Sequence, residues 1–197
     1  THHSMEDLSL MQSIPNMNVL CPGDPIEVDA CIKIYKKFKG PVYLRLGKKG
    51  ERLVNEKKFK LKALTPNTIQ KGSNVAIIAV GNTLDLSQDI CDELKKIKIN
   101  SALISLIFLK PLNIKFINMI FKKYKLIILV EEHSEIGGAA ATIKNNLDKI
   151  KNFSKESLIT FSAPDKFLGG IGDQANIRNK INLEKRKIVN KIVKTLK

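Results

Sequence analysis

Residues 18–47 read NVLCPGDPIEVDACIKIYKKFKGPVYLRLG, and this stretch decides the fold class. It predicts a strand at 18–21, a Pro-Gly-Asp-Pro turn, a helix at 26–38 and a second strand at 41–46. Asp24 is placed to cap the helix, with Pro25 at its first position and Glu27 at its third. Strand–helix–strand order predicts a parallel pair of strands, which is typical of an α/β sheet.

The chain after residue 74 repeats this alternation at greater length. Residues 75–80 form an apolar run that ends in Gly81, which suits a strand buried on both faces. Further strands are predicted at 102–108, 126–131 and 158–161, and helices at 84–97, 114–122, 140–150 and 183–196. This order predicts a doubly wound sheet of four or five strands with helices on both faces.

The two patterns divide the chain into residues 1–49, a linker at 50–73 and a second domain at 74–197. The first part also holds a predicted short helix at 6–14. In the linker the periodicity weakens and the charge rises, and we expect a short hairpin or strand at 58–64. The first part has no strand ahead of its opening residues and no initiator Met, so we expect the chain to be the C-terminal piece of a larger protein.

The composition is that of a globular protein in a reducing compartment. Apolar residues make up 43% of the chain, yet no apolar run approaches the roughly 20 residues of a membrane span. No basic-then-apolar leader opens the chain. The three cysteines are odd in number and show no CxxC spacing, which supports neither a disulfide framework nor a zinc site. We expect a cytoplasmic protein with no membrane partner.

The net charge of +15 could indicate a nucleic-acid partner. The lysines, however, are dispersed in pairs along the chain, with few aromatic residues between them to stack on bases. No helix-turn-helix, zinc or RNA-recognition signature is present. We therefore expect no nucleic-acid partner, and a diffuse positive field that attracts phosphorylated metabolites.

Three residues are candidates for binding a substrate. Arg45 and Lys48 stand at the end of the predicted strand 41–46, where ligands dock in α/β sheets, and a basic pair there can hold a phosphate or carboxylate. The alternative for Lys48 is a solvated lysine in a loop. His2 suits a substrate-facing role because the neutral and charged forms of His are both accessible near neutral pH. Its alternative is the scar of a purification tag.

Glu131, Glu132 and His133 form a second constellation, followed by Gly137 and Gly138. Two carboxylates and an imidazole at a strand end suit a metal cluster or an acid/base set. Adjacent side chains on a strand point to opposite faces, however, so the two carboxylates are not expected to form a tight pair. We expect an interface or loop-ordering role for His133, and a sharp turn at the glycines.

Two other features have mainly structural explanations. Cys21 has no fixed His or Lys beside it in the sequence, so we expect a small buried apolar residue rather than a nucleophile. The glycine-rich segment 165–172 is expected to be a surface connection, and Asp173 the N-cap of a short helix.

The order of these motifs resembles transketolase-like enzymes over essentially the whole chain. Thr1-His2, Glu6-Asp7, Ile14-Pro15-Asn16, Pro22-Gly23-Asp24 and the strand at 40–45 are similar to the later half of their pyrimidine-binding domain. Gly81, Lys110-Pro111-Leu112, the Glu131-Glu132-His133 run and Gly137-Gly138 resemble their C-terminal domain. The resemblance implies an incomplete parallel-sheet pyrimidine domain followed by a doubly wound α/β C-terminal domain.

The resemblance also implies thiamine diphosphate and Mg²⁺ chemistry, in which a two-carbon ketol unit passes between sugar phosphates. In that family the His of the Thr-His pair faces the substrate as a catalytic residue, which corresponds to His2. The basic residue after the strand binds the sugar-phosphate end. It corresponds to Lys48, where transketolases usually have Arg, and Lys lacks the planar fork of Arg.

The segments that bind the cofactor and metal in this family have no counterpart in the chain. We therefore expect no cofactor-binding residue here, no turnover by this chain alone, and a missing N-terminal portion or a partner subunit. The resemblance further implies a homodimer. Related alternatives are 1-deoxyxylulose-5-phosphate synthase and the β subunit of a 2-oxo acid dehydrogenase. A different class of alternative is a non-catalytic module that dimerises or binds an anion.

Overall fold

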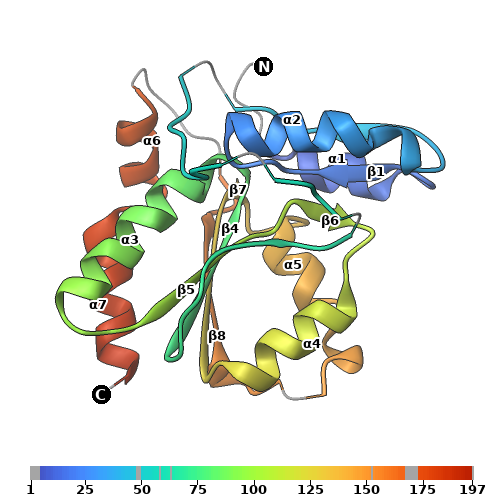
Figure 1. The fold of residues 1–197 in the computed structure, drawn as a ribbon. Coiled ribbons are helices and arrows are strands. Elements are labelled where there is room, and N and C mark those ends of the chain that lie inside the picture. Colours follow the sequence, from blue (N-terminus) through green and yellow to red (C-terminus); the bar gives the residue numbers. More distant parts are fainter. Residues whose placement is uncertain are drawn as a thin grey trace.

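The computed structural model describes residues 5–47, 50–57, 59–62, 64–151, 153–166 and 173–196. Two sheets organise these residues (Figure 1). The smaller sheet has the order β2-β1-β6, and the larger has the order β3-β5-β4-β7-β8. The α/β class predicted from the sequence is confirmed.

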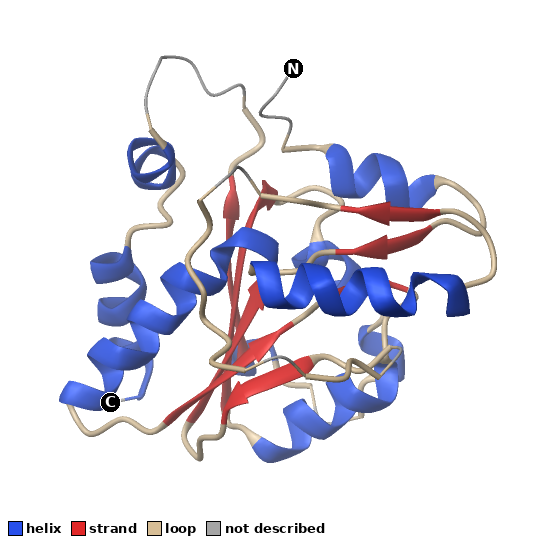
Figure 2. Cartoon of the chain, turned by 45° about the horizontal axis from the view of Figure 1, so that its top comes forward, coloured by secondary structure: helices blue, strands red, loops and turns tan. Residues whose placement is uncertain are grey.

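The first sheet contains the predicted strand–helix–strand unit. Strand β1 (Asn18–Leu20) pairs in parallel with β2 (Val42–Leu44), and helix α2 (Pro25–Ile34), extended by a 3-10 turn at Tyr35–Lys37, connects them. A short helix, α1 (Asp7–Ser13), precedes β1. Figure 2 shows β1 and β2 side by side, with their arrowheads directed toward the larger sheet.

Helix α2 begins where the sequence indicates. The Asp24 side chain accepts the backbone N–H of Glu27 at 2.8 Å, and Pro25 stands at the first helical position. Glu27 in turn accepts the N–H of Gly23 at 2.8 Å. The first bond satisfies a donor that the first turn of a helix leaves without an intrahelical partner, and the second holds the residue before the N-cap.

The second sheet is built around β4. Val75, Ile77 and Ala79 of β4 face one apolar cluster, and Ala76 and Ile78 face another, so this strand is buried on both sides. Helices α3 and α7 cover the first face and helices α4 and α5 cover the second (Figure 1). The elements are β4 (Val75–Val80), α3 (Leu84–Lys96), β5 (Ser101–Ser105), α4 (Ile114–Lys123), β7 (Leu126–Ser134), α5 (Ala139–Lys144), β8 (Leu158–Ala163), α6 (Gln174–Lys180) and α7 (Lys185–Leu196).

Two sequence predictions need correction. No strand lies in the described part of 58–64; instead, β3 (Asn67–Gln70) forms an antiparallel edge beside β5. The predicted strand at 102–108 is divided between two sheets, because β5 ends at Ser105 and β6 (Phe108–Lys110) pairs antiparallel with β1. The apolar run is unbroken across this division, so periodicity cannot locate it.

The two predicted domains share an apolar cluster. Leu8, Val19 and Cys21 from the N-terminal part pack in the same cluster as Ala76 and Leu129 from the second domain. Strand β6 adds a backbone connection between the domains. None of the helices in the described ranges is long and apolar enough to cross a membrane.

Candidate functional site

The carboxyl ends of strands from both sheets face each other. Gly23, after β1, approaches the C-terminal domain so closely that an added Cβ would lie 2.6 Å from Leu84 Cβ and 2.8 Å from the Gly81 carbonyl oxygen. Glycine is therefore required at Gly23 for this approach. Ligands bind at such edges in α/β proteins, which makes this junction the candidate site.

A cleft of about 250 Å³ opens at this junction. Its lining comes from the turn after β1, the start of α2, the segment after β2 and Asn82 after β4: Pro22, Gly23, Asp24, Pro25, Val28, Leu46, Gly47, Gly50, Glu51 and Asn82. Lys48 follows Gly47 in the chain, but it lies outside the described residues, as does His2. Of the three substrate candidates, the structure therefore describes Arg45 alone.

Arg45 connects three elements at the junction. Its Nε lies 3.0 Å from Oδ2 of Asp7 on α1, and one terminal nitrogen, Nη2, donates to the carbonyl oxygen of Glu132 on β7 at 2.9 Å. Tyr43 also donates to Asp7 Oδ2, at 2.9 Å. Burial, the bond to Asp7 and the charge of Asp7 raise the pKa of Tyr43 to about 12, so its phenol remains protonated and able to donate.

The Glu131 and Glu132 side chains point in different directions, as expected for neighbours on a strand. Glu131 accepts the N–H groups of Ala139 at 2.6 Å and Ala140 at 3.2 Å, and the Ser162 hydroxyl at 2.8 Å. Burial raises the pKa of the Glu131 carboxyl, and these bonds oppose that rise. Glu131 therefore anchors the start of α5 and does not form a pair with Glu132.

Glu132 belongs to a separate polar group. It accepts hydrogen bonds from Asn82 at 2.6 Å and from Gln174 at 3.2 Å, and it forms an ion pair with Arg178. Arg178 also reaches Asp85 on α3. This group attaches helix α6, capped by Asp173 as predicted, to the carboxyl end of the sheet. Residues 167–172 of the preceding segment lie outside the described residues.

A buried polar network around Glu27 was not recognised in the sequence. Ser105 of β5 donates to Glu27 Oε2 at 2.7 Å, and Asn67 of β3 donates to Oε1 at 2.9 Å. Asp24 accepts the backbone N–H groups of Val54 at 3.1 Å and Asn55 at 2.8 Å. The capping pair Asp24 and Glu27 was visible in the sequence, but its partners lie 28 to 78 residues away along the chain.

Cys21 behaves as the sequence indicates. All three cysteines are free and buried, and burial is the main cause that raises the pKa of the Cys21 thiol to about 12. A thiol of this kind holds almost no nucleophilic thiolate at neutral pH. Within the described ranges, no group of three or more His, Cys, Asp or Glu side chains could hold a metal ion.

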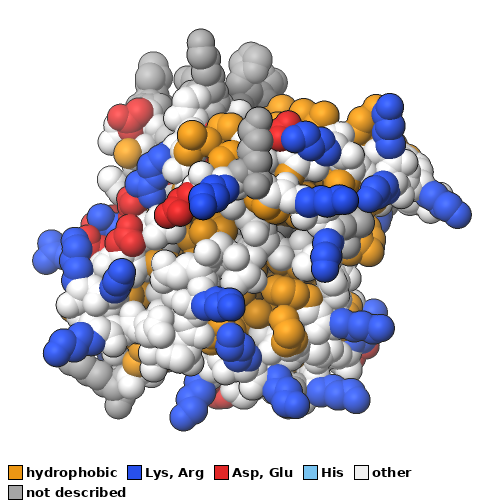
Figure 3. Space-filling view, in the orientation of Figure 1, with side chains coloured by type: hydrophobic (Ala, Val, Ile, Leu, Met, Phe, Trp, Pro, Cys, Tyr) orange, Lys and Arg blue, Asp and Glu red, His pale blue; other side chains and the backbone are white. Residues whose placement is uncertain are grey.

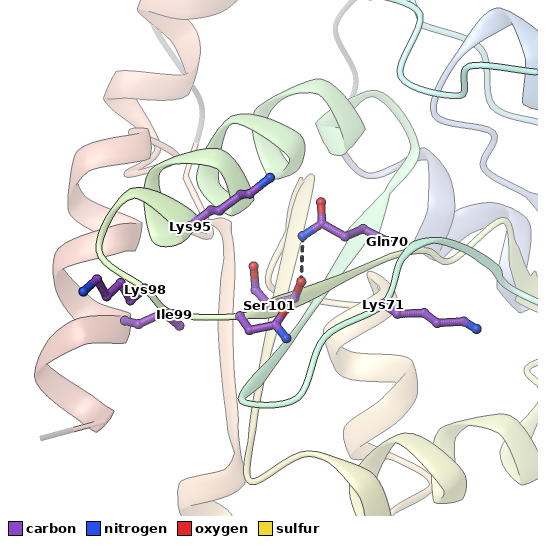
Figure 4. Close-up of a pocket in the computed structure, with 7 residues that line it drawn as sticks. Gln70, Lys71, Lys95, Lys98, Ile99 and Ser101 are labelled. Carbon is purple, nitrogen blue, oxygen red and sulfur yellow. Dashed lines mark hydrogen bonds between the residues drawn. The ribbon is translucent and has the colours of Figure 1, made fainter.

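A second hollow, of about 430 Å³, lies at the opposite end of the larger sheet. Lys71, Lys95 and Lys98 line it, but Figure 4 shows the ammonium groups of Lys71 and Lys98 pointing away on opposite sides. Lys and Arg side chains are also scattered over much of the face seen in Figure 3. The positive charge is thus distributed over the surface, and it does not converge on this hollow.

Comparison with known families assigns both parts of the chain. Residues 1–52 match the family described as "Transketolase, pyrimidine binding domain", and residues 65–185 match "Transketolase, C-terminal domain". Similar curated proteins include 1-deoxy-D-xylulose-5-phosphate synthases from Natranaerobius thermophilus (30% identical over 100% of this chain) and Alkaliphilus oremlandii (29% over 98%). The chain spans 31% of the length of each synthase.

Another relative is one of the subunits of an apulose-4-phosphate transketolase from Phocaeicola vulgatus. It is 29% identical over 76% of this chain and 48% of its own length. Among solved structures, one described as "Split gene transketolase, inactive beta4 tetramer" has a TM-score of 0.84 and 24% identity, over 99% of this chain and 62% of its own. A transketolase mutant from Pichia stipitis has a TM-score of 0.65 and 17% identity, over 98% and 27%.

The likeness to the solved structures supports the fold, and the two family matches follow each other along the chain in the order that the motifs predict. The chain belongs to the transketolase family, as a C-terminal portion with pyrimidine-binding and C-terminal domain sequence.

Proposed function

We propose that this chain is the C-terminal part of a thiamine diphosphate-dependent transferase of carbohydrate metabolism, which moves two-carbon ketol units between sugar phosphates. The observation that carries this proposal is the succession of the two family matches in one chain, 1–52 and then 65–185. The complete activity needs an N-terminal portion or a partner subunit, and the chain is inactive alone. The limited share of the relatives' length that it spans supports this requirement.

We assign the substrate site to the junction of the two sheets. Arg45 binds an anionic group of the sugar phosphate through its terminal nitrogen Nη1, which is buried and has no hydrogen-bond partner among the described residues. Lys48 binds the phosphate, and His2 faces the reacting end of the substrate as the catalytic residue. Both assignments rest on the resemblance, and the cleft beside Gly47 supports the position of a substrate near Lys48.

The cofactors of the complete enzyme are thiamine diphosphate and Mg²⁺. We assign both cofactors to segments outside this sequence, because the family's motifs that bind them have no counterpart among its residues. Bound thiamine diphosphate supplies the carbanion chemistry of ketol transfer. The residues of this chain bind and orient the sugar phosphate beside it.

We further propose a cytoplasmic homodimer without a nucleic-acid or membrane partner. The buried, unpaired cysteines support a reducing compartment. The dispersed surface lysines support attraction of phosphorylated metabolites rather than recognition of nucleic acid.

A second candidate is the activity of 1-deoxy-D-xylulose-5-phosphate synthase. The curated relatives that match over nearly all of the chain favour it, since they carry that name. The two activities differ in the donor, which is a ketose phosphate in the first and pyruvate in the second. Both need an aldose phosphate acceptor and the same cofactor.

The decisive experiment uses the complete polypeptide, or this chain together with its partner subunit. The protein is incubated with thiamine diphosphate, Mg²⁺ and an aldose phosphate, and with either a ketose phosphate or pyruvate as donor. Ketose products from the ketose donor support the transketolase activity, and products from pyruvate alone support the synthase. No product from either donor, with no thermal shift on adding the cofactor, would instead indicate a non-catalytic module.

A further inference from the structure

Helix α1 is held in place by the C-terminal domain. It has only seven residues, and an isolated helix of this length is not stable in water. Within the helix, Gln12 donates to the carbonyl oxygen of Gly137 (2.8 Å) and accepts from the Thr142 hydroxyl (2.7 Å). Lys110 Nζ donates to the carbonyl oxygens of Gln12 and of Ile14, which follows the helix (2.7 Å each). Before the helix, the carbonyl oxygen of Met5 accepts the N–H of Ser134 (2.8 Å). The position of α1 therefore depends on the second domain.

The N-terminus of α1 has no side-chain cap of its own. Glu6 occupies the capping position but makes no side-chain cap hydrogen bond. The N–H of Ser9, at the third helical position, is one of the donors that a helix leaves without an intrahelical partner. It donates to Nε2 of His133, at 3.3 Å. A residue of the C-terminal domain thus takes the place of a capping residue.

The His133 ring is fixed at both nitrogens. A backbone N–H can only donate, so Nε2 is the unprotonated nitrogen and Nδ1 carries the proton. Nδ1 donates to the carbonyl oxygen of Ser134 at 2.8 Å. The side chain is completely buried, which excludes a direct role on substrate in this arrangement. His133 therefore acts as a fixed hydrogen-bond acceptor for the first turn of α1.

The two glycines after β7 create the space for this contact. A Cβ on Gly137 would lie 2.3 Å from Ser9 Cβ, and a Cβ on Gly138 would lie 2.8 Å from His133 Nδ1. Both distances are far shorter than van der Waals contact allows. The glycine pair and His133 together form the surface against which the first turn of α1 packs.

We propose that His133 is a positioning residue for the transfer reaction: it caps α1 from the C-terminal domain and thereby fixes the start of α1, where the preceding residues join the fold. His2 lies five residues before Asp7, the first residue of α1, in the sequence. The proposal rests on the proposed function, because that function assigns the catalytic role to His2. A displacement of about 1 Å at a reacting group costs up to roughly 100-fold in rate.

Three variants of the complete enzyme test the proposal. His133→Asn retains a polar group near Nδ1 but removes the acceptor at the position of Nε2. His133→Gln restores an acceptor oxygen near that position. Ser9→Ala is the matched control, because it retains the backbone N–H of Ser9 and removes only the hydroxyl, which bonds to Glu6 O.

We expect His133→Asn to lower kcat roughly 10- to 100-fold with little change in KM for the sugar phosphates. His133→Gln recovers most of kcat, and Ser9→Ala retains the wild-type value. Unchanged kcat in His133→Asn, equal loss in the Asn and Gln variants, or a rise in KM alone would each overturn the positioning role. If His133→Asn does not fold, Gly137→Ala serves instead, since it displaces Ser9 while leaving His133 in place, and we expect the same loss of kcat.

Amide hydrogen exchange separates this inference from the proposed function. The Ser9 amide should lose protection in His133→Asn and retain it in His133→Gln and Ser9→Ala, whatever the reaction. If the wild-type enzyme transfers no two-carbon unit, the proposed function fails while the exchange result still decides whether His133 caps α1. Unchanged protection of Ser9 in His133→Asn would overturn the cap itself.

Discussion

Arg45 and Asp7 form an ion pair that leaves one atom of each side chain unused. Nε of Arg45 lies 3.0 Å from Oδ2 of Asp7, while Arg45 Nη1 and Asp7 Oδ1 are buried without a hydrogen-bond partner among the described residues. Buried polar atoms without partners are uncommon in native proteins, and each needs an explanation. The pair therefore has a half that is bonded within the protein and a half, Arg45 Nη1, that we assign to the substrate in the proposed function.

The first prediction separates these two halves. In the complete enzyme, Arg45→Met should raise KM for the phosphorylated acceptor about tenfold, because a charge-assisted hydrogen bond to the substrate is lost. Asp7→Asn should lower thermal stability but leave that KM within about twofold, because Arg45 remains in place. Steady-state kinetics with a phosphorylated and an unphosphorylated aldose measures the difference. Equal changes of KM in the two variants would show that Arg45 acts only through the ion pair.

The second prediction concerns the pH dependence of stability caused by Glu27. Burial raises the pKa of the Glu27 carboxyl above 4.5, against the effects of hydrogen bonds from Asn67, Gly23 and Ser105. The folded state therefore binds the carboxyl proton of Glu27 more tightly than the unfolded chain does. The resulting stabilisation is complete below pH 4.5 and is lost as the pH rises to the folded pKa. Above the folded pKa, Glu27 causes no further change in the free energy of unfolding.

We expect Glu27→Gln to remove this part of the pH dependence, which amounts to about 1.4 kcal/mol for each unit by which the pKa is raised. Urea unfolding at a series of pH values measures the slope in the wild type and the variant. Glu131 contributes a slope of the same sign, so the variant retains part of it. Glu56→Gln, at an exposed position, should behave as the wild type. An identical slope in Glu27→Gln and the wild type would contradict the assignment.

The third prediction concerns Gly138. A Cβ at this position would lie 2.5 Å from Glu131 Oε2 and 2.8 Å from His133 Nδ1, and both side chains are fixed by hydrogen bonds. Gly138→Ala should therefore lower the free energy of unfolding by about 2 to 3 kcal/mol. Chemical denaturation measures this change.

Gly81→Ala is the comparison for Gly138→Ala. Gly81 has a φ of 61°, but the nearest atom to an added Cβ is Cys21 Cβ at 3.8 Å. Only backbone strain of about 1 to 2 kcal/mol is then expected. If the Gly81 variant were the less stable of the two, the Glu131 and His133 side chains would have to move more freely than their hydrogen bonds indicate.

Local sequence patterns predict the elements of this fold well, because the forces that set them are local. The apolar run 75–80 gives a strand buried on both faces, and Asp24 caps α2 through a bond to a residue three positions away. Helix α3 begins at the predicted residue and ends one residue early. These features depend on periodicity and capping, which a single sequence records.

The connections between elements are less predictable, because each depends on a partner far away in the chain. Nothing near Ser105 or Asn67 indicates that both bond to Glu27. The division of the run 102–108 between two sheets depends on the backbone bond from Cys21 N to Ile107 O. The link from His133 to Ser9 spans 124 residues. An interface or loop-ordering role for His133 stays a prediction, and Ser9 could not be named as its partner from the sequence.

The partners of Arg178 are also distant in the sequence, so they could not be predicted from local patterns. These contacts are the basis of the fourth prediction. The Arg178 guanidinium donates to Glu132, to Asp85 at 3.1 Å and to the carbonyl oxygen of Asn82 at 2.7 Å, and the Arg178 side chain is 12% exposed. Arg178→Met leaves two carboxylates without their cation, and we expect a loss of about 3 kcal/mol in the free energy of unfolding. Helix α6 should also lose protection against hydrogen exchange, since Arg178 is its main attachment to β7 and α3.

Two further variants identify the cause of that loss. In Arg178→Met with Glu132→Gln, one unpaired charge is removed while Asn82 and Gln174 retain an acceptor, so we expect recovery of about half of the lost free energy. Arg186→Met, at an exposed position of α7, should change stability by no more than about 0.5 kcal/mol. If Arg178→Met were as mild as Arg186→Met, the ion pairs of Arg178 would not be what holds α6 to the sheet.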